Sequence, residues 1–268
     1  MNKSTVFGLI LAVGSLIVSG AMELNHLNPE GISPFLKPSA LIMIFGATAG
    51  ATMCTVSWEL FMKLPTITRI AFKEVHFDSK GIVPTFVSFS EKARKEGLLA
   101  LEEDIEQTTD LFLKKGLQLV VDGVDPEVVR GVLESEIDNT KARHKEGADM
   151  FTAMGGFAPT MGIVGTVLGL IAALTMAGQG AESNKVVGAI ATAFIATFYG
   201  IGGANLVFLP IGGKLTQLDH HEAQYRELVS YGILSIMSGD NPRIVQEKLS
   251  VFLSEGDRVD LEKKEEGE

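Results

Sequence analysis

The sequence has very little cysteine and no excess of basic residues, and both shortages exclude classes of protein. Cys54 is the only cysteine among 268 residues, so no internal disulfide can form. Lys and Arg total 23 against 33 Asp and Glu, which gives a formal net charge of −10. Because nucleic-acid-binding faces are basic, nucleic acid is not an expected partner. The lone thiol lies in an apolar stretch, where we expect a small packing residue rather than a redox centre.

Charge is also absent from four long stretches, although it is dense elsewhere. An α-helix needs about 20 mostly apolar residues to cross the hydrocarbon, and its backbone groups pair within the segment. The pattern therefore predicts an all-α integral membrane protein with four transmembrane helices, of which the third and fourth are long enough to tilt or extend beyond the lipid. The uncharged stretches are residues 5–22, 38–57, 150–177 and 186–213.

The predicted spans divide the chain into four parts. Residues 1–57 hold the first two spans and a short external loop, and residues 58–149 form a helical cytoplasmic domain. Residues 150–213 hold the last two spans, and residues 214–268 form cytoplasmic C-terminal helices with a charged tail. This orientation follows from an excess of Lys and Arg beside the second, third and fourth stretches, because loops rich in Lys and Arg remain on the cytoplasmic side of the membrane. These residues are Lys63, Arg69, Lys73, Lys141, Arg143, Lys145, Lys214 and Arg226.

The first stretch has an alternative interpretation as a cleaved signal peptide. Lys3, the apolar run and the small residues at positions 19–21 fit that pattern. Three further apolar stretches make secretion unnecessary. We therefore expect a membrane span here, with both termini in the cytoplasm.

Apolar spacing within residues 58–149 predicts helices throughout. Two helices are expected over residues 83–100 and 102–121. A third is expected to begin at Pro126, with Asp125 as its N-cap, and to run towards the third span. The domain therefore connects to the membrane through a helix.

The C-terminal part should continue the fourth span as a helix over residues 215–237. Gly239 is expected to end this helix, and Asn241 to cap the next one. Residues 257–268 are highly charged, and we expect them to be frayed or disordered.

No Asp, Glu, Lys, Arg or His occurs in any of the four uncharged stretches. A membrane transporter normally carries an ionisable group at membrane depth. If this chain conducts ions, the carboxylate must therefore come from another polypeptide.

Small residues and threonines share faces of the last two stretches. Gly162, Thr166 and Gly169 lie three or four residues apart in the third stretch. Small faces allow helices to approach closely in lipid, so packing alone can explain the glycines and alanines. A threonine hydroxyl can instead offer an oxygen to a dehydrated cation or water, or can bond its own helix carbonyl. The fourth stretch has Ala189, Ala193, Thr197, Gly200 and Ala204.

Two prolines lie within or at the edge of these spans. Pro159 and Pro210 each remove a backbone donor and are expected to bend the helix. Each is either a static kink or a hinge that transmits a change of charge in the membrane to the cytoplasmic helices.

Four segments are distinctive: residues 92–106, 115–123, 157–170 and 239–249. Together with the layout of the spans, they resemble the MotA/PomA family of flagellar stator subunits over nearly the whole chain. The resemblance implies a pentameric ring around a dimer of a MotB/PomB-type single-span, peptidoglycan-binding partner. That partner would supply the membrane aspartate, and passage of H⁺ or Na⁺ would turn the ring against a FliG-type rotor protein. The resemblance also implies a bacterial inner-membrane location, no enzymatic activity and no cofactor beyond the transported ion.

The resemblance assigns roles to six residues. Arg94 and Glu102 match charged residues that engage the rotor, although a solvated helix face would look the same. Pro159 and Pro210 match two prolines linked to torque. Two threonines match positions on the ion path, and the one in the third span is typical of sodium-type members, which favours Na⁺ over H⁺. These threonines are Thr166 and Thr197.

Two other functions compete with a stator role. ExbB/TolQ-type energisers, which are proton-driven, resemble the last two spans but have one span before the cytoplasmic segment, whereas this chain has two. A membrane enzyme or non-conducting scaffold is the other alternative. The histidines lack metal-ligand spacing, and no Gly-rich phosphate loop follows a strand. The histidines are His26, His76, His144, His220 and His221.

Overall fold

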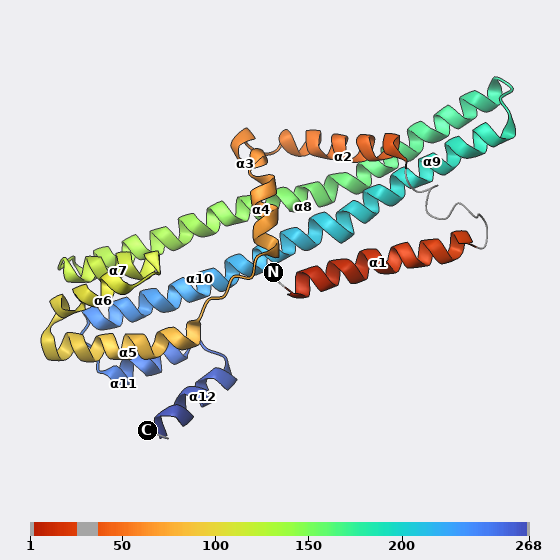
Figure 1. The fold of residues 1–268 in the computed structure, drawn as a ribbon. Coiled ribbons are helices and arrows are strands. Elements are labelled where there is room, and N and C mark those ends of the chain that lie inside the picture. The colour runs from red at the N-terminus through yellow and green to blue at the C-terminus, as the bar shows by residue number, and fades with distance from the viewer. Residues whose placement is uncertain (1–2, 26–36, 267–268) are drawn as a thin grey trace. The chain divides into compact units, whose positions relative to one another are not determined.

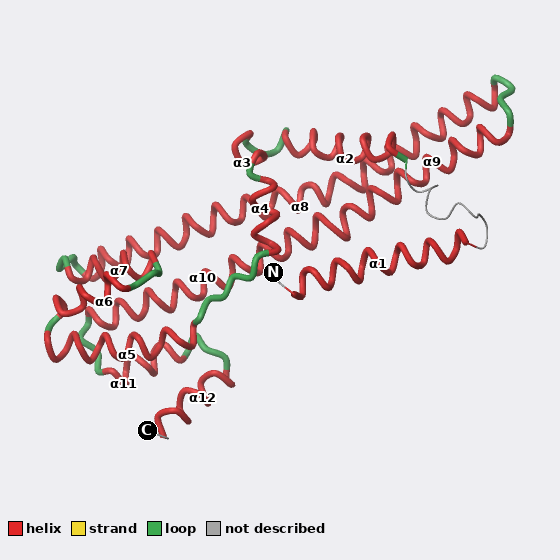
Figure 2. Tube along the Cα trace, viewed as in Figure 1, coloured by secondary structure: helices red, strands yellow, loops and turns green. Residues whose placement is uncertain are grey.

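The computed structural model describes residues 3–25 and 37–266. Within these ranges every regular element is helical and no strand occurs, which confirms the predicted all-α class (Figures 1 and 2). The chain forms two compact units, each built from two separate segments. The first unit comprises Met1–Val75 and His144–Gln217, and the second comprises His76–Arg143 and Leu218–Glu268.

The first unit contains the apolar helices. Among the described residues, three helical stretches are long and apolar enough to cross a membrane: Lys3–Met22, Pro126–Gly178 and Ser183–Met237. Pro38–Met53 is apolar but shorter, with 16 residues. The elements of this unit include α1 (Lys3–Asn25), α2 (Pro38–Met53), α3 (Trp58–Met62), α4 (Leu64–Phe72), part of α8 (Pro126–Gly178), α9 (Ser183–Gly202), the π-helical segment η3 (Gly203–Phe208) and the start of α10 (Leu209–Met237).

The end of the second predicted span was placed too late. Helix α2 ends at Met53 rather than continuing to residue 57. The Thr55 hydroxyl donates to the Thr52 carbonyl at 2.8 Å, and Ser57 caps the following helix by accepting from the Leu60 amide at 3.3 Å. Such local side-chain bonds favour a turn over a continued helix. Most of the predicted external loop between the first two spans lies outside the described residues.

The predicted start of α8 is confirmed. Asp125 Oδ1 accepts from the Glu127 amide at 2.9 Å, and Pro126 occupies the first helical position, where its missing donor costs nothing. The helix then continues unbroken for 53 residues to Gly178, so the predicted continuation towards the third span is also confirmed. The charged and apolar parts of this helix are therefore one continuous element.

A π-helical segment between α9 and α10 was not anticipated from the sequence. It covers Gly203–Phe208 and ends just before Pro210, the second residue of α10. A proline ring would clash with the carbonyl four residues earlier in a regular helix, and a wider turn relieves that clash. Pro210 thus changes the helical geometry upstream of itself without interrupting the helical path.

The second unit has its own hydrophobic core, to which all of its helices contribute. The largest fully buried side chains in this core include Phe86, Leu117 and Leu228. Burying side chains of this size is the dominant stabilising contribution to such a unit. The elements confined to it are α5 (Ser79–Glu96), η2 (Leu98–Leu101), α6 (Glu102–Gln107), α7 (Leu111–Val121), α11 (Pro242–Ser250) and α12 (Glu255–Glu266).

Two predicted helices in this unit have different boundaries from those expected. The helix predicted over residues 83–100 begins earlier and ends at Glu96, because Gly97 adopts a φ of 89° that a helix cannot continue. The helix predicted over residues 102–121 is two helices. Asp110 separates them, since its carboxylate accepts from the Phe112 amide at 2.8 Å and starts α7.

The prediction of a frayed tail was wrong for residues 257–266. They belong to α12, whose first turn is capped where the Ser254 hydroxyl accepts from the Asp257 amide at 3.3 Å. Lys80 of α5 binds Asp260 at 2.7 Å and so ties this helix to the unit. The predicted helix after Asn241 is confirmed, because its side chain accepts from the Arg243 amide at 3.0 Å.

Candidate functional site

Helices α8 and α9 pack with their backbones in contact. A methyl group added to Gly200 would lie 2.5 Å from the Ala158 carbonyl oxygen, and one added to Gly169 would lie 2.6 Å from the Ala193 methyl. Both distances are well below ordinary van der Waals separation, so these positions accept only glycine without movement. The packing interpretation of the small-residue faces is therefore confirmed at these positions.

The two predicted ion-pathway threonines meet at this contact. The hydroxyl oxygens of Thr166 on α8 and Thr197 on α9 are hydrogen-bonded to one another. Thr166 Oγ1 also lies 3.1 Å from the carbonyl oxygens of Gly162 and Ala193, and Thr197 Oγ1 lies 3.4 Å from that of Gly162. Both threonines are half-buried. The contact therefore gathers two hydroxyls and two carbonyls, which we call the threonine cluster.

The threonine cluster presents oxygen dipoles without a charge. The two threonine hydroxyls supply only two protons for hydrogen bonds among four oxygens, namely the two hydroxyls and the two carbonyls. Some oxygen lone pairs therefore remain, and these can accept a hydrogen bond from water or contact a cation. Ion pathways use carbonyl and hydroxyl oxygens in this way to replace part of a hydration shell. No group of three or more His, Cys, Asp or Glu within residues 3–25 and 37–266 is placed to hold a metal ion. The cluster itself consists of hydroxyls and backbone carbonyls, so it has no titrating side chain of its own.

The two prolines lie at different distances from this contact along their helices. Pro159 is half-buried in α8 and directly follows Ala158, whose carbonyl packs against Gly200. Pro210 is exposed and follows the π-helical segment. Pro159 therefore removes a backbone donor beside a close contact of the two helices, and Pro210 does so where the helical geometry changes.

The predicted rotor-contact residues are exposed in the second unit. Arg94 lies in the last turn of α5 and Glu102 in the first turn of α6, with the Gly97 turn between them. Neither forms an ion pair with any other residue that the structure describes. Lys92, by contrast, binds Asp104 at 2.6 Å, and this hydrogen bond raises the pKa of Lys92 above its usual value. The charges of Arg94 and Glu102 are therefore available for ion pairs with another protein.

Three polar residues in the apolar stretches were missed by the sequence reasoning. Asn205, in the π-helical segment, donates from its side chain to the Ile201 carbonyl at 3.0 Å. The Tyr199 hydroxyl accepts from the Lys37 amide at 3.4 Å, where α2 begins. Thr48 on α2 is fully buried, and its hydroxyl has no hydrogen-bond partner in the described part of the chain. A search for uncharged polar residues in the spans would have found all three.

The described residues form an all-helical protein whose apolar helices are long enough to span a membrane, with an uncharged, close-packed helix pair and a charged helical unit. This combination is typical of polytopic helical membrane proteins. Residues 104–228 match the MotA/TolQ/ExbB proton channel family.

Similarity to individual proteins narrows the class. The chain is 38% identical to Motility protein A of Borreliella burgdorferi, with 97% of each chain covered. It is 33% identical to the chemotaxis protein PomA of Vibrio alginolyticus, over 97% of this chain and 98% of that protein. A chain in the solved flagellar MotAB stator complex from Bacillus subtilis is 33% identical and superimposes with a TM-score of 0.87, over 97% of this chain and 99% of that one. The chain belongs to the MotA/PomA family of flagellar stator subunits.

Proposed function

We propose that this chain builds the ring of an ion-driven flagellar stator. Four helices cross the bacterial inner membrane, and α2 is the shortest of them. Residues 58–149 and 214–268 face the cytoplasm together with both termini, as the distribution of Lys and Arg favours. The pentameric form of the ring is an inference from the family resemblance.

A MotB/PomB-type single-span subunit is the partner in this proposal. The solved complex from Bacillus subtilis contains MotA and MotB, and so does that from C. jejuni, whose chain is 29% identical to this one with a TM-score of 0.86. The four uncharged stretches of this chain contain no Asp, Glu, Lys, Arg or His. The partner's membrane aspartate would therefore carry the charge that the ion neutralises.

The threonine cluster is the single observation that carries the ion-pathway proposal. Thr166 and Thr197 join their hydroxyls across an otherwise apolar contact between α8 and α9. A helix pair that needed only packing would be satisfied by the glycines and alanines around them. We propose that the cluster faces the path of the ion beside the partner's carboxylate. The ion is H⁺ or Na⁺, and Thr166 favours Na⁺.

Torque would follow when the ion changes the charge beside α8 and α9. Pro159 and Pro210 lie in helices that continue from the apolar stretches into the second unit. A change of angle at either proline would move the cytoplasmic helices. The exposed charges of Arg94 and Glu102 would then form ion pairs with a FliG-type rotor protein. Electrostatic attraction between opposite charges steers the association of two such surfaces.

The test is swimming speed measured against sodium concentration, with and without a protonophore. A sodium-driven stator gives a speed that rises with sodium and persists when the proton gradient is collapsed. A speed that is independent of sodium and abolished by the protonophore would contradict the sodium assignment and leave H⁺ as the ion. The ExbB/TolQ-type alternative is tested by topology, because it requires residues 23–37 to lie in the cytoplasm.

A further inference from the structure

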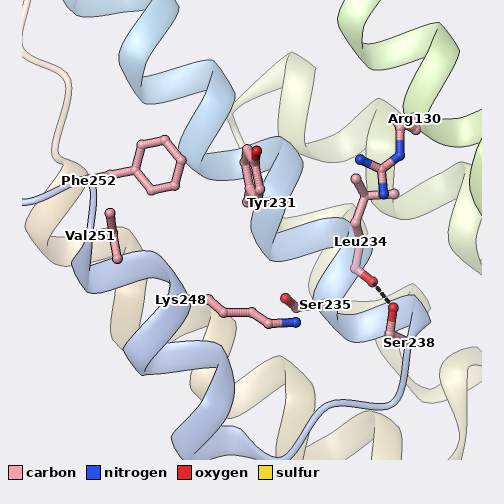
Figure 3. Close-up of a pocket in the computed structure, with 8 residues that line it drawn as sticks. All are labelled: Arg130, Tyr231, Leu234, Ser235, Ser238, Lys248, Val251 and Phe252. Carbon is pink, nitrogen blue, oxygen red and sulfur yellow. Dashed lines mark hydrogen bonds between the residues drawn. The ribbon is translucent and has the colours of Figure 1, made fainter.

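A cavity in the second unit has a lining unlike the surface around it. Its volume is about 420 Å³, which is within the range of small-molecule sites. The lining includes two cationic side chains, Lys248 and Arg130, and no carboxylate. The whole chain has ten more acidic than basic residues. Because the only charged residues in this lining are cations, the cavity favours an anion over a cation. Its residues are Arg130, Tyr231, Leu234, Ser235, Ser238, Lys248, Val251 and Phe252 (Figure 3).

The two cations retain donors for a ligand. Lys248 Nζ binds Asp240 at 2.6 Å, which uses one of its three N–H groups. Arg130 has only a long contact of 3.8 Å from its Nε to Glu127, and its side chain is exposed. They come from different helices, α11 and α8, at opposite sides of the cavity (Figure 3). Lysine and arginine donors of this kind bind phosphate through charge-assisted hydrogen bonds.

A serine hydroxyl also lines the cavity. Ser235 lies on α10 and is only 3% exposed as a residue, yet it contributes to the lining. Ser238 directly follows the last residue of α10, and its hydroxyl donates to the Leu234 carbonyl at 2.9 Å (Figure 3). The Ser235 hydroxyl can therefore donate to an acceptor on a ligand in the cavity.

The remaining wall of the cavity is apolar and aromatic. The rings of Tyr231 and Phe252 lie 5.2 Å apart with an interplanar angle of 50°, and the Tyr231 side chain is half exposed. Val251 and Leu234 extend this surface. An exposed aromatic face stacks well on a flat ring such as a nucleobase.

We propose that this cavity binds a small phosphorylated ligand that carries a flat ring, of the nucleotide class. The phosphate lies between Lys248 and Arg130 and accepts from the Ser235 hydroxyl, and the ring packs on Tyr231. This site is separate from the threonine cluster, so the proposal stands whether or not the chain conducts ions.

The test is calorimetric titration of the full chain in detergent micelles with AMP, GMP, CMP and UMP. At least one nucleotide should bind saturably, at one site per chain, with a Kd of about 1 mM or tighter. Lys248→Gln should weaken that binding about tenfold or more, because it removes the charge but keeps the length of the side chain. Ser235→Ala should weaken it about threefold or more.

Two matched controls separate the site from general effects on charge or folding. Ser238→Ala should change the affinity less than about twofold, because that hydroxyl already donates within the helix. Lys185→Gln removes an exposed lysine beside the start of α9 and should have no effect. The proposal is overturned if none of the four nucleotides binds saturably, if Lys248→Gln binds as the unmodified chain does, or if inorganic phosphate alone binds as tightly as the best nucleotide.

Discussion

Replacing Gly200 with alanine should separate α8 from α9 and destabilise the first unit. The added methyl group would lie 2.5 Å from the Ala158 carbonyl oxygen and 3.0 Å from the Gly162 Cα. These are backbone atoms, which cannot rotate away, so the helices must move apart by about 1 Å to restore ordinary contact. Thr197 lies one turn earlier on the same helix, and the same movement would break its contact with Thr166.

The magnitude follows from two opposing contributions. Overpacking of this kind costs about 1–3 kcal/mol, and fixed backbone neighbours place this site in the upper part of the range. Alanine regains about 1 kcal/mol over glycine within a helix. The expected net loss is about 1–2 kcal/mol, and each kcal/mol lowers Tm by about 2–4 °C for a chain of this size.

The assay is thermal unfolding of the purified full chain in detergent micelles, followed by circular dichroism at the helical band. Gly188→Ala is the matched control, because it lies on the same helix and its added methyl would meet nothing within 4 Å. The control should be unchanged or slightly stabilised, and Gly200→Ala should melt several degrees lower. Equal Tm values for the two variants would refute the packing of α8 against α9 through Gly200.

Three further changes test the functional assignments. Thr166→Ala should reduce or abolish the dependence of swimming speed on sodium, because one oxygen leaves the threonine cluster; an unchanged sodium dependence would exclude Thr166 from the ion path. Charge reversal at Arg94 or Glu102 should reduce motility severalfold while membrane levels stay normal, because both charges are exposed and unpaired among the described residues; normal swimming of both variants would exclude rotor contact there. Pro159→Ala should assemble normally yet give little torque on a tethered-cell assay, since it restores a helical donor beside the α8–α9 contact; full torque would leave Pro159 as a static kink.

Much of the helical architecture could be predicted from the sequence because its signals are local. The N-cap at Asp125 and the helix start after Asn241 need only a side chain and the amide two residues later. The uncharged stretches identify the apolar helices by composition. Where a boundary was missed, the cause was also local, as with the positive φ of Gly97 and the Asp110 cap. Both residues carry standard stop or start signals that apolar periodicity alone overlooks.

Other features depend on contacts between segments distant in the sequence. Helical spacing placed Thr166 and Thr197 on small-residue faces but could not pair them, because their contact depends on how α8 docks on α9. The π-helical segment before Pro210 arises from accommodating the ring within a continuous helix. The α12 helix is held by Lys80, which lies 180 residues before its partner Asp260. The composition of this charged segment does not predict an ordered helix, because it contains few apolar residues to bury.

The most direct test of the account is cation flux into sealed vesicles that contain this chain as the only polypeptide. Flux of either Na⁺ or H⁺ should be no greater than in empty vesicles, since the four uncharged stretches contain no Asp, Glu, Lys, Arg or His. A channel-forming antibiotic added at the end should then release the gradient and show that the vesicles were intact. Saturable flux through the chain alone would contradict the claim that its charge is supplied by a second subunit.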